Sequence, residues 1–176
     1  MTPETVTIET PSGLRIVGDH WAGDGDTVVL AHGGGQTRHS WGGTAATLAA
    51  RGFRVLSIDQ RGHGDSDWSP DGDYRLSAFC DDALAVIAWT GAPVAWVGAS
   101  LGGSTGMHVL AADPTAIDRL VLVDITPRPA MPGVPVQARR LTEGSRTDQA
   151  KTPTSQRGSA STPPEGMHRC MSTPTG

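Results

Sequence analysis

The sequence predicts an α/β fold with a mostly parallel sheet, an antiparallel hairpin at its N-terminal end, and helices on both faces. Three observations predict this fold: two period-two stretches at the start, four continuous valine-rich runs after them, and helical patterns between those runs. Continuous apolar runs are typical of strands that are buried on both faces of a sheet. With 176 residues, the chain is long enough for one domain with its own core.

The strands follow from the two kinds of apolar pattern. Residues 6–10 and 14–21 alternate apolar and polar side chains and are joined by the turn signal Pro11-Ser12-Gly13, so we expect an antiparallel hairpin. The continuous runs TVVLAH, RVLSID, VAWVGA and RLVLVDI then predict buried strands over residues 27–32, 54–59, 94–99 and 119–125.

Three helices are expected between these strands. Residues 40–52 and 76–91 supply two of them, and each ends at a glycine, Gly52 or Gly91, in the position of a C-terminal cap. The third follows Ser100 and ends near Pro114, which prevents continuation of a helix. The alternation of strand and helix implies right-handed crossovers between parallel strands.

The composition changes abruptly after Leu141. The remaining 35 residues contain no Val, Ile, Leu, Phe, Trp or Tyr, and 20 of them are Ser, Thr, Pro or Gly. Such a segment buries too little apolar surface to offset the entropy of ordering it. We therefore expect an ordered part over residues 1–141 and a disordered tail over residues 142–176. A reading-frame shift in the gene is one hypothesis for the change.

Charge and cysteine content exclude several classes of protein. The net charge of −4, with no basic cluster longer than Arg139-Arg140, argues against a nucleic acid partner. The N-terminus lacks the basic and apolar regions of a signal peptide, and no apolar run has membrane-spanning length, so we expect a cytoplasmic protein without a membrane partner. Cys80 and Cys170 lack metal-type spacing, so we expect two free thiols and no metal site.

A serine motif stands between one predicted strand and one predicted helix. Gly98-Ala99-Ser100-Leu101-Gly102 fits the pattern GxSxG of a nucleophile elbow, where small flanking residues let strand and helix pass closely. The alternative is a glycine-rich corner whose serine merely caps the helix. Two other glycine-rich loops follow predicted strands: HGGG at residues 32–35, and DQRGHGDS at residues 59–66, with Asp59 and Arg61 as a candidate ion pair.

The ordered set HGGG, DQRGHGDS and GASLGG resembles the α/β-hydrolase fold superfamily over residues 6–127, in the branch with epoxide-hydrolase-like, haloperoxidase-like and carboxylesterase-like members. The resemblance implies that Ser100 is the nucleophile and that the backbone amides of Leu101 and Gly34 form the oxyanion hole. A serine at the elbow implies ester-type acyl transfer, or the related perhydrolase reaction, on a small-molecule substrate. The aspartate-based chemistry of epoxide hydrolases is not implied, and no cofactor is expected.

The resemblance leaves the general base and the acid of the mechanism unassigned. In the family, these residues lie beyond the position of Pro127, where this sequence has no recognisable counterpart, so we expect an incomplete hydrolase fold with impaired activity. Asp124 occupies a place that some relatives use for the acid, with a capping or loop role as the alternative. Structural, loop or surface roles are expected for the histidines, which are His20, His32, His39, His63, His108 and, in the tail, His168.

Two other functions compete with a serine hydrolase. The first is a non-catalytic remnant or binding module on the hydrolase scaffold, which explains the missing base. The second is a dinucleotide-binding oxidoreductase, because VVLAHGGGQTR joins a strand to glycines and Asp59 ends the next strand; however, Arg38 replaces the third glycine of that fingerprint.

The strands that flank the last predicted strand in the family are also missing from this sequence. We therefore expect a strand over residues 117–125 at the edge of the sheet. An exposed apolar edge invites self-association of the chain.

Overall fold

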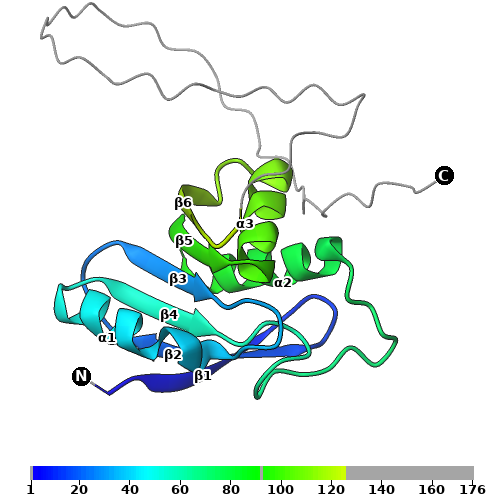
Figure 1. Cartoon of the computed structure of the whole chain (residues 1–176), viewed down its shortest axis with the longest axis horizontal. Helices are drawn as coiled ribbons and strands as arrows, with labels where there is room; N and C mark the ends of the chain where they lie inside the picture. The colour runs from blue at the N-terminus through cyan, green and yellow to red at the C-terminus, as the bar shows by residue number, and fades with distance from the viewer. Residues whose placement is uncertain (1, 92, 126–176) are drawn as a thin grey trace, which may run out of the picture. The chain divides into compact units, whose positions relative to one another are not determined.

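Six strands form one mixed sheet in the computed structural model, which describes residues 2–91 and 93–125 (Figure 1). They are β1 (Glu4–Glu9), β2 (Arg15–Trp21), β3 (Thr27–Ala31), β4 (Arg54–Ile58), β5 (Val94–Ala99) and β6 (Ile117–Val123), and their order across the sheet is β1-β2-β4-β3-β5-β6. The hairpin strands pair antiparallel with each other, and β2 pairs antiparallel with β4. The pairs β3–β4, β3–β5 and β5–β6 are parallel, which confirms the predicted fold class.

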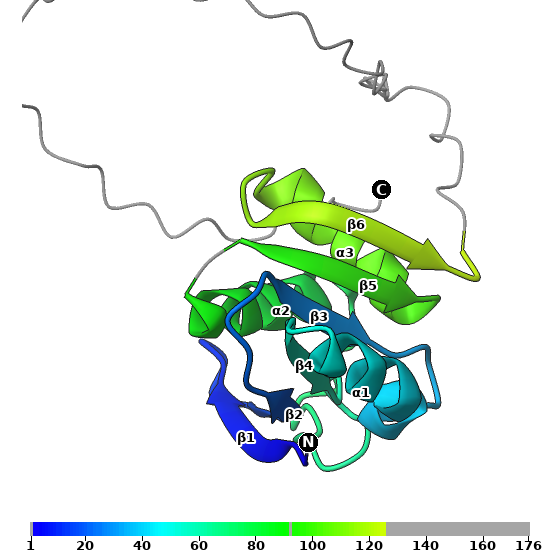
Figure 2. The same cartoon turned by 90° about the vertical axis from the view of Figure 1, so that its left-hand side faces the viewer.

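The helices cover both faces of the sheet, as predicted (Figure 2). A 3-10 turn, η1 (Arg38–Trp41), leads into α1 (Gly42–Ala50) on one face, and α2 (Leu76–Thr90) and α3 (Leu101–Ala112) pack on the other. Gly91 ends α2 in the left-handed conformation, with φ 78°, and its amide donates to Ala88 O at 3.1 Å. The predicted glycine cap of this helix is therefore confirmed.

The core consists of two apolar clusters, one on each face. The α2 and α3 face buries Val29, Leu56 and Trp96, and the α1 face buries Leu30 and Val55. All five residues of β3 are buried, because this strand lies inside the sheet and is covered on both faces. The continuous apolar run that predicted this strand reflects that double burial.

Strand β6 lies at the edge of the sheet within the described residues, as predicted. Its register places Val121 opposite Val97 and Val123 opposite Ala99. Val121 is 48% exposed and Val123 is 39% exposed, whereas Leu120 and Leu122 are half-buried. One face of β6 is thus packed and the other face is open to solvent.

The predictions for the two cysteines and for the tail have different outcomes. The prediction of a free thiol at Cys80 is wrong, because this cysteine is disulfide-bonded. Cys170, the boundary at Leu141 and the tail over residues 142–176 lie outside the described residues. In the part of the chain that is described, no helix has the length and apolar character needed to cross a membrane.

Candidate active site

Ser100 occupies the sharp turn between β5 and α3. Its backbone has φ 43° and ψ −104°, a conformation that is rare for residues other than glycine and costs about 1–3 kcal/mol. Two backbone hydrogen bonds hold it there: Ser100 N donates to Val123 O at 3.1 Å, and Ser104 N donates to Ser100 O at 2.9 Å. The Ser100 side chain makes no capping hydrogen bond to α3. The geometry therefore does not fit the alternative of a helix-capping serine.

The glycines around Ser100 are required by close backbone contacts. A Cβ atom on Gly98 would lie 2.3 Å from the carbonyl carbon of Gly102, and one on Gly102 would lie 2.3 Å from Ala31 O. Real Cβ atoms do not approach other atoms this closely. Strand β5, strand β3 and the first turn of α3 therefore meet at a distance that only glycine permits.

The loop after β3 reaches the same point. A Cβ atom on Gly33 would lie 3.5 Å from Ser100 Cβ, and Gly102 N donates to His32 O at 3.1 Å. The amides of Gly34 and Leu101 donate to no acceptor within residues 2–91 and 93–125. The structure therefore brings the HGGG loop beside the serine and leaves the two amides implied by the resemblance without an acceptor there.

His32 is buried and both of its ring nitrogens are in use. Nδ1 donates to Gly33 O at 2.8 Å, and Nε2 accepts from Gln60 N at 3.1 Å. Burial is the largest cause that lowers the pKa of His32. Its Nε2 accepts a hydrogen bond, which only the neutral ring can do. A neutral ring with both nitrogens bonded holds the loop in place and has no nitrogen left to take a proton from Ser100.

His63 braces the same loop from the other side. Its Nδ1 donates to Arg61 O at 2.9 Å, its Nε2 accepts from Gly35 N at 3.2 Å, and its ring centroid lies 4.9 Å from that of His32. This arrangement agrees with the structural role expected for both loop histidines.

The other described histidines have partners away from Ser100 Oγ. The His20 ring packs perpendicular to the Trp89 ring, His39 lies 3.7 Å from the Asp19 carboxylate, and His108 Nδ1 contacts Ser104 O. No hydrogen bond between a histidine and Ser100 Oγ occurs in the described part of the chain. His168 lies outside that part.

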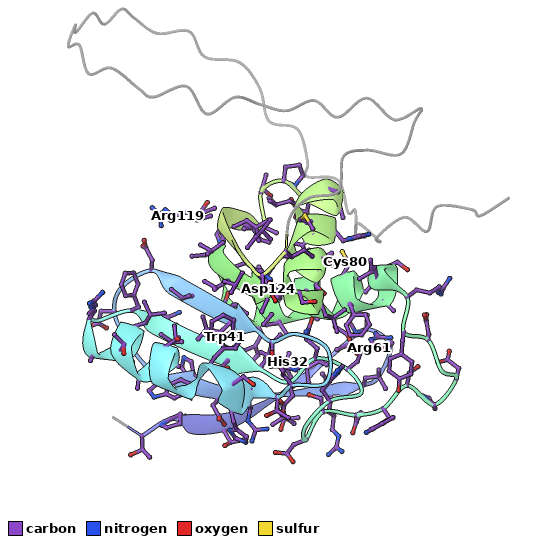
Figure 3. The ribbon with its side chains drawn as sticks, viewed as in Figure 1. His32, Trp41, Arg61, Cys80, Arg119 and Asp124 are labelled. Atoms are coloured by element: carbon purple, nitrogen blue, oxygen red, sulfur yellow. The ribbon has the colours of Figure 1, made fainter. Side chains whose placement is uncertain are left out.

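Asp124 directly follows Val123, whose carbonyl accepts the Ser100 amide. It has φ 53° and is exposed, and Ser100 and Asp124 are the two described residues other than glycine with positive φ. Figure 3 labels Asp124 after β6 and His32 after β3. Asp124 therefore stands at the carboxyl ends of the parallel strands, as Ser100 and His32 do.

The prediction of an ion pair between Asp59 and Arg61 is wrong. Asp59 instead accepts hydrogen bonds from Arg38: one from the Arg38 backbone amide at 2.6 Å, and one from the Arg38 guanidinium. Arg61 makes a two-point ion pair with Asp82 of α2, at 2.6 and 2.7 Å. Strand β4 ends at Ile58 and the chain then turns, so the two side chains diverge. Because the Asp59 carboxylate is fully buried and already bonded, it does not fit a ribose contact.

Gln60 is a residue of this region that the sequence pattern did not single out. It is buried, donates its side-chain amide to His32 O at 2.7 Å, and accepts from Thr105 at 3.1 Å. Its place inside the DQRGHGDS motif was the one signal available, because its partners lie 28 and 45 residues away in the chain.

Comparisons with known proteins agree with this arrangement. A model of the alpha/beta hydrolase fold matches residues 26–170. The chain is 38% identical over 109 residues to "Esterase Rv0045c" of Mycobacterium tuberculosis, covering 61% of this chain and 35% of that protein. It is 37% identical over 116 residues to the "sn-1-specific diacylglycerol lipase ABHD11" of Mus musculus, covering 62% and 37%.

A solved structure shares the fold. Epoxide hydrolase VrEH1 from Vigna radiata superposes with a TM-score of 0.70 and 26% identity, over 76% of this chain and 42% of that one. In these comparisons the chain spans between 35% and 42% of each relative. The family match covers most of the sequence, and the chain belongs to the alpha/beta hydrolase fold family.

Proposed function

We propose that this chain carries the nucleophile and the oxyanion donors of a serine hydrolase that acts on ester-type small molecules. The observation that carries the proposal is the strained backbone of Ser100, held between β5 and α3 beside the loop that contains Gly34. Strain of this kind persists where the surrounding structure enforces it, and it is concentrated at functional sites.

The proposed chemistry is an acyl transfer. Ser100 Oγ attacks the carbonyl carbon of the ester, and the carbonyl electron pair moves onto oxygen. The amides of Gly34 and Leu101 donate to that oxyanion, helped by the N-terminal end of α3. The hydroxyl proton passes to a base and then to the departing alcohol, and water later releases the acid from Ser100.

No histidine among residues 2–91 and 93–125 hydrogen-bonds to Ser100 Oγ, so the base of this mechanism is unassigned there. His32 and His63, the histidines of the loops beside Ser100, have both ring nitrogens bonded to backbone groups. We therefore propose that the base does not come from these loops and that Ser100 in this chain is weakly activated. Asp124 is the candidate acid, because it follows the strand whose last carbonyl holds the Ser100 amide.

The names of the relatives support an ester-type substrate. Two of them are named as an esterase and a lipase. The structural neighbour is named as an epoxide hydrolase, but the resemblance implies an aspartate at the elbow for that chemistry, and this chain has Ser100. A non-catalytic protein on the same scaffold is the second candidate. It is favoured because the ring nitrogens of His32 and His63 are already hydrogen-bonded to backbone groups.

Hydrolysis of p-nitrophenyl acetate by the purified chain tests the degree of activation. We expect turnover barely above the buffer rate and nearly unchanged by Ser100→Ala, because losing the serine or histidine of a serine protease costs about a millionfold in turnover. Ser104→Ala is the matched control. Rapid turnover that Ser100→Ala abolishes would contradict weak activation, and His32→Ala and His168→Ala would then locate the base.

A further inference from the structure

The backbone carbonyl of His32 is the point where three segments meet beside Ser100. It accepts from Gly102 N of α3 at 3.1 Å and from Gln60 Nε2 at 2.7 Å. The Gln60 backbone amide in turn donates to His32 Nε2 at 3.1 Å. Gln60 thus holds both the backbone and the ring of the residue that opens the HGGG loop.

The other end of the Gln60 side chain is tied to α3. Thr105 Oγ1 lies 3.1 Å from Gln60 Oε1 and 3.0 Å from Leu101 O, so its one proton is shared between two acceptors. Gln60 is 4% exposed and Thr105 is 1% exposed. The carboxamide can adopt one orientation only, because its nitrogen faces a carbonyl and its oxygen faces a hydroxyl.

We infer that Gln60 is a positioning residue that sets the separation between the Gly34 and Leu101 amides. The inference rests on the proposed function, in which these amides hold the oxyanion. One end of the carboxamide fixes His32, two residues before Gly34, and the other end fixes Thr105, whose hydroxyl reaches Leu101 O. Misplacing a catalytic group by 1 Å can cost roughly 100-fold in rate, so such a brace affects catalysis without touching the substrate.

A small pocket borders the hydrogen bonds of the Gln60 side chain. Gln60 and Thr105 line it together with Arg61, Asp82 and Trp96, among other residues. Rotation of the carboxamide away from α3 would take its oxygen out of reach of the Thr105 hydroxyl. The Thr105 hydroxyl opposes that rotation, since a buried carboxamide oxygen without a hydrogen-bond donor destabilises the folded state.

Thr105→Val tests the brace, with Thr90→Val as its matched control. Both threonines are buried near a helix carbonyl, Leu101 O for Thr105 and Ile87 O for Thr90, but Thr105 also reaches Gln60. In the full chain, we expect Thr105→Val to shift the amide NMR resonances of Gly34 and Leu101. Exchange of the Gly102 amide should become about 2- to 10-fold faster, as for loss of one neutral hydrogen bond.

The control should leave these three amides unchanged. Equal effects of Thr105→Val and Thr90→Val, or unchanged Gly34 and Leu101 resonances in Thr105→Val, would overturn the inference.

Gln60→Glu adds a readout that simple packing does not produce. A protonated glutamate donates to His32 O and accepts from Thr105, as glutamine does, whereas an ionised one loses the donor. We expect the Gly34 and Leu101 resonances of Gln60→Glu to approach those of the wild type on acidification. Gln60→Met, which fills similar space without hydrogen bonds, should show no such recovery, and equal pH responses of the two variants would overturn the inference.

The rate at which a fluorophosphonate modifies Ser100 separates the two proposals. We expect Thr105→Val to slow this labelling and Thr90→Val to leave it unchanged. Absence of labelling in the wild type, with the amide shifts as expected, would refute the proposed function and leave the positioning of the two amides supported.

Discussion

Ser100 combines a polar reactive side chain with a backbone conformation that favours glycine. Its φ of 43° and ψ of −104° lie in a positive-φ region that glycine, which has no Cβ atom, adopts more easily than other residues. The hydrogen bonds to Val123 and Ser104 use the backbone alone, so they remain possible when Ser100 is replaced by glycine or alanine. The backbone strain at Ser100 therefore comes from its Cβ atom, which glycine lacks.

Replacing Ser100 by glycine should stabilise the chain. We expect the free energy of unfolding of Ser100→Gly to exceed that of Ser100→Ala by about 1 kcal/mol, since relief of about 1–3 kcal/mol of strain is partly offset by the greater backbone entropy of unfolded glycine. Urea denaturation monitored by tryptophan fluorescence measures the difference. A glycine variant less stable than the alanine variant would show that the turn is not strained.

At the scale of elements, the segments that follow the carboxyl ends of β3, β4 and β5 hydrogen-bond to one another. Asp59, at the end of β4, accepts from Arg38 of η1 and from Asp65 N at 3.0 Å. Arg38 also reaches the Asp19 and Asp65 carboxylates. Asp59 and Arg38 are buried, and their contacts tie the start of η1 to the end of β4 and the loop that follows it.

Gly64 makes the packing around Asp59 possible. A Cβ atom at Gly64 would lie 2.1 Å from Asp59 Oδ2, and Gly64 has φ 51°. Gly72 has φ 72°, but a Cβ atom there would meet no neighbouring atom within 4 Å. We expect Gly72→Ala to lower the free energy of unfolding by about 1 kcal/mol through its backbone alone, and Gly64→Ala to lower it by about 3–5 kcal/mol by displacing the buried carboxylate from its partner. Chemical denaturation compares the two, and similar values would show that the Asp59 group tolerates displacement.

The elements were predictable because their signals are local. Valine-rich runs, glycines at helix ends and the GxSxG pattern each lie within a few residues, and they located β3 to β6, the end of α2 and the turn at Ser100. The contacts that build the site join distant residues. Thr105 meets Gln60 across 45 positions and Arg61 meets Asp82 across 21, so pairing Asp59 with its near neighbour Arg61 gave the wrong partner.

At the scale of the whole molecule, one face of β6 is open to solvent within the part of the chain that the structure describes. Val121 and Val123 are exposed there, on the outermost strand of the described sheet. Natural sheets protect such edges with charges, prolines or covering segments. Arg119, which is exposed and pairs with Asp26, is the charged residue at the start of this face.

We expect the purified chain to self-associate through this edge. Val121→Lys should reduce concentration-dependent oligomerisation, because a buried lysine at a strand–strand contact disfavours pairing. Trp68→Lys, at a residue that is 72% exposed in the loop before α2, is the control for removing an exposed apolar side chain elsewhere. Light scattering over a concentration series measures the effect. A wild-type monomer at high concentration would refute this expectation.

We propose that Ser100 is a nucleophile held beside two oxyanion donors and only weakly activated. Mass spectrometry after exposure to a fluorophosphonate tests this role of Ser100 most directly, with Ser100→Ala and Ser104→Ala as paired variants. We predict a slow, stoichiometric adduct on Ser100 that Ser104→Ala retains and Ser100→Ala loses. No adduct on Ser100 would contradict its role as a nucleophile, and labelling at the rate of an intact serine hydrolase would contradict its weak activation.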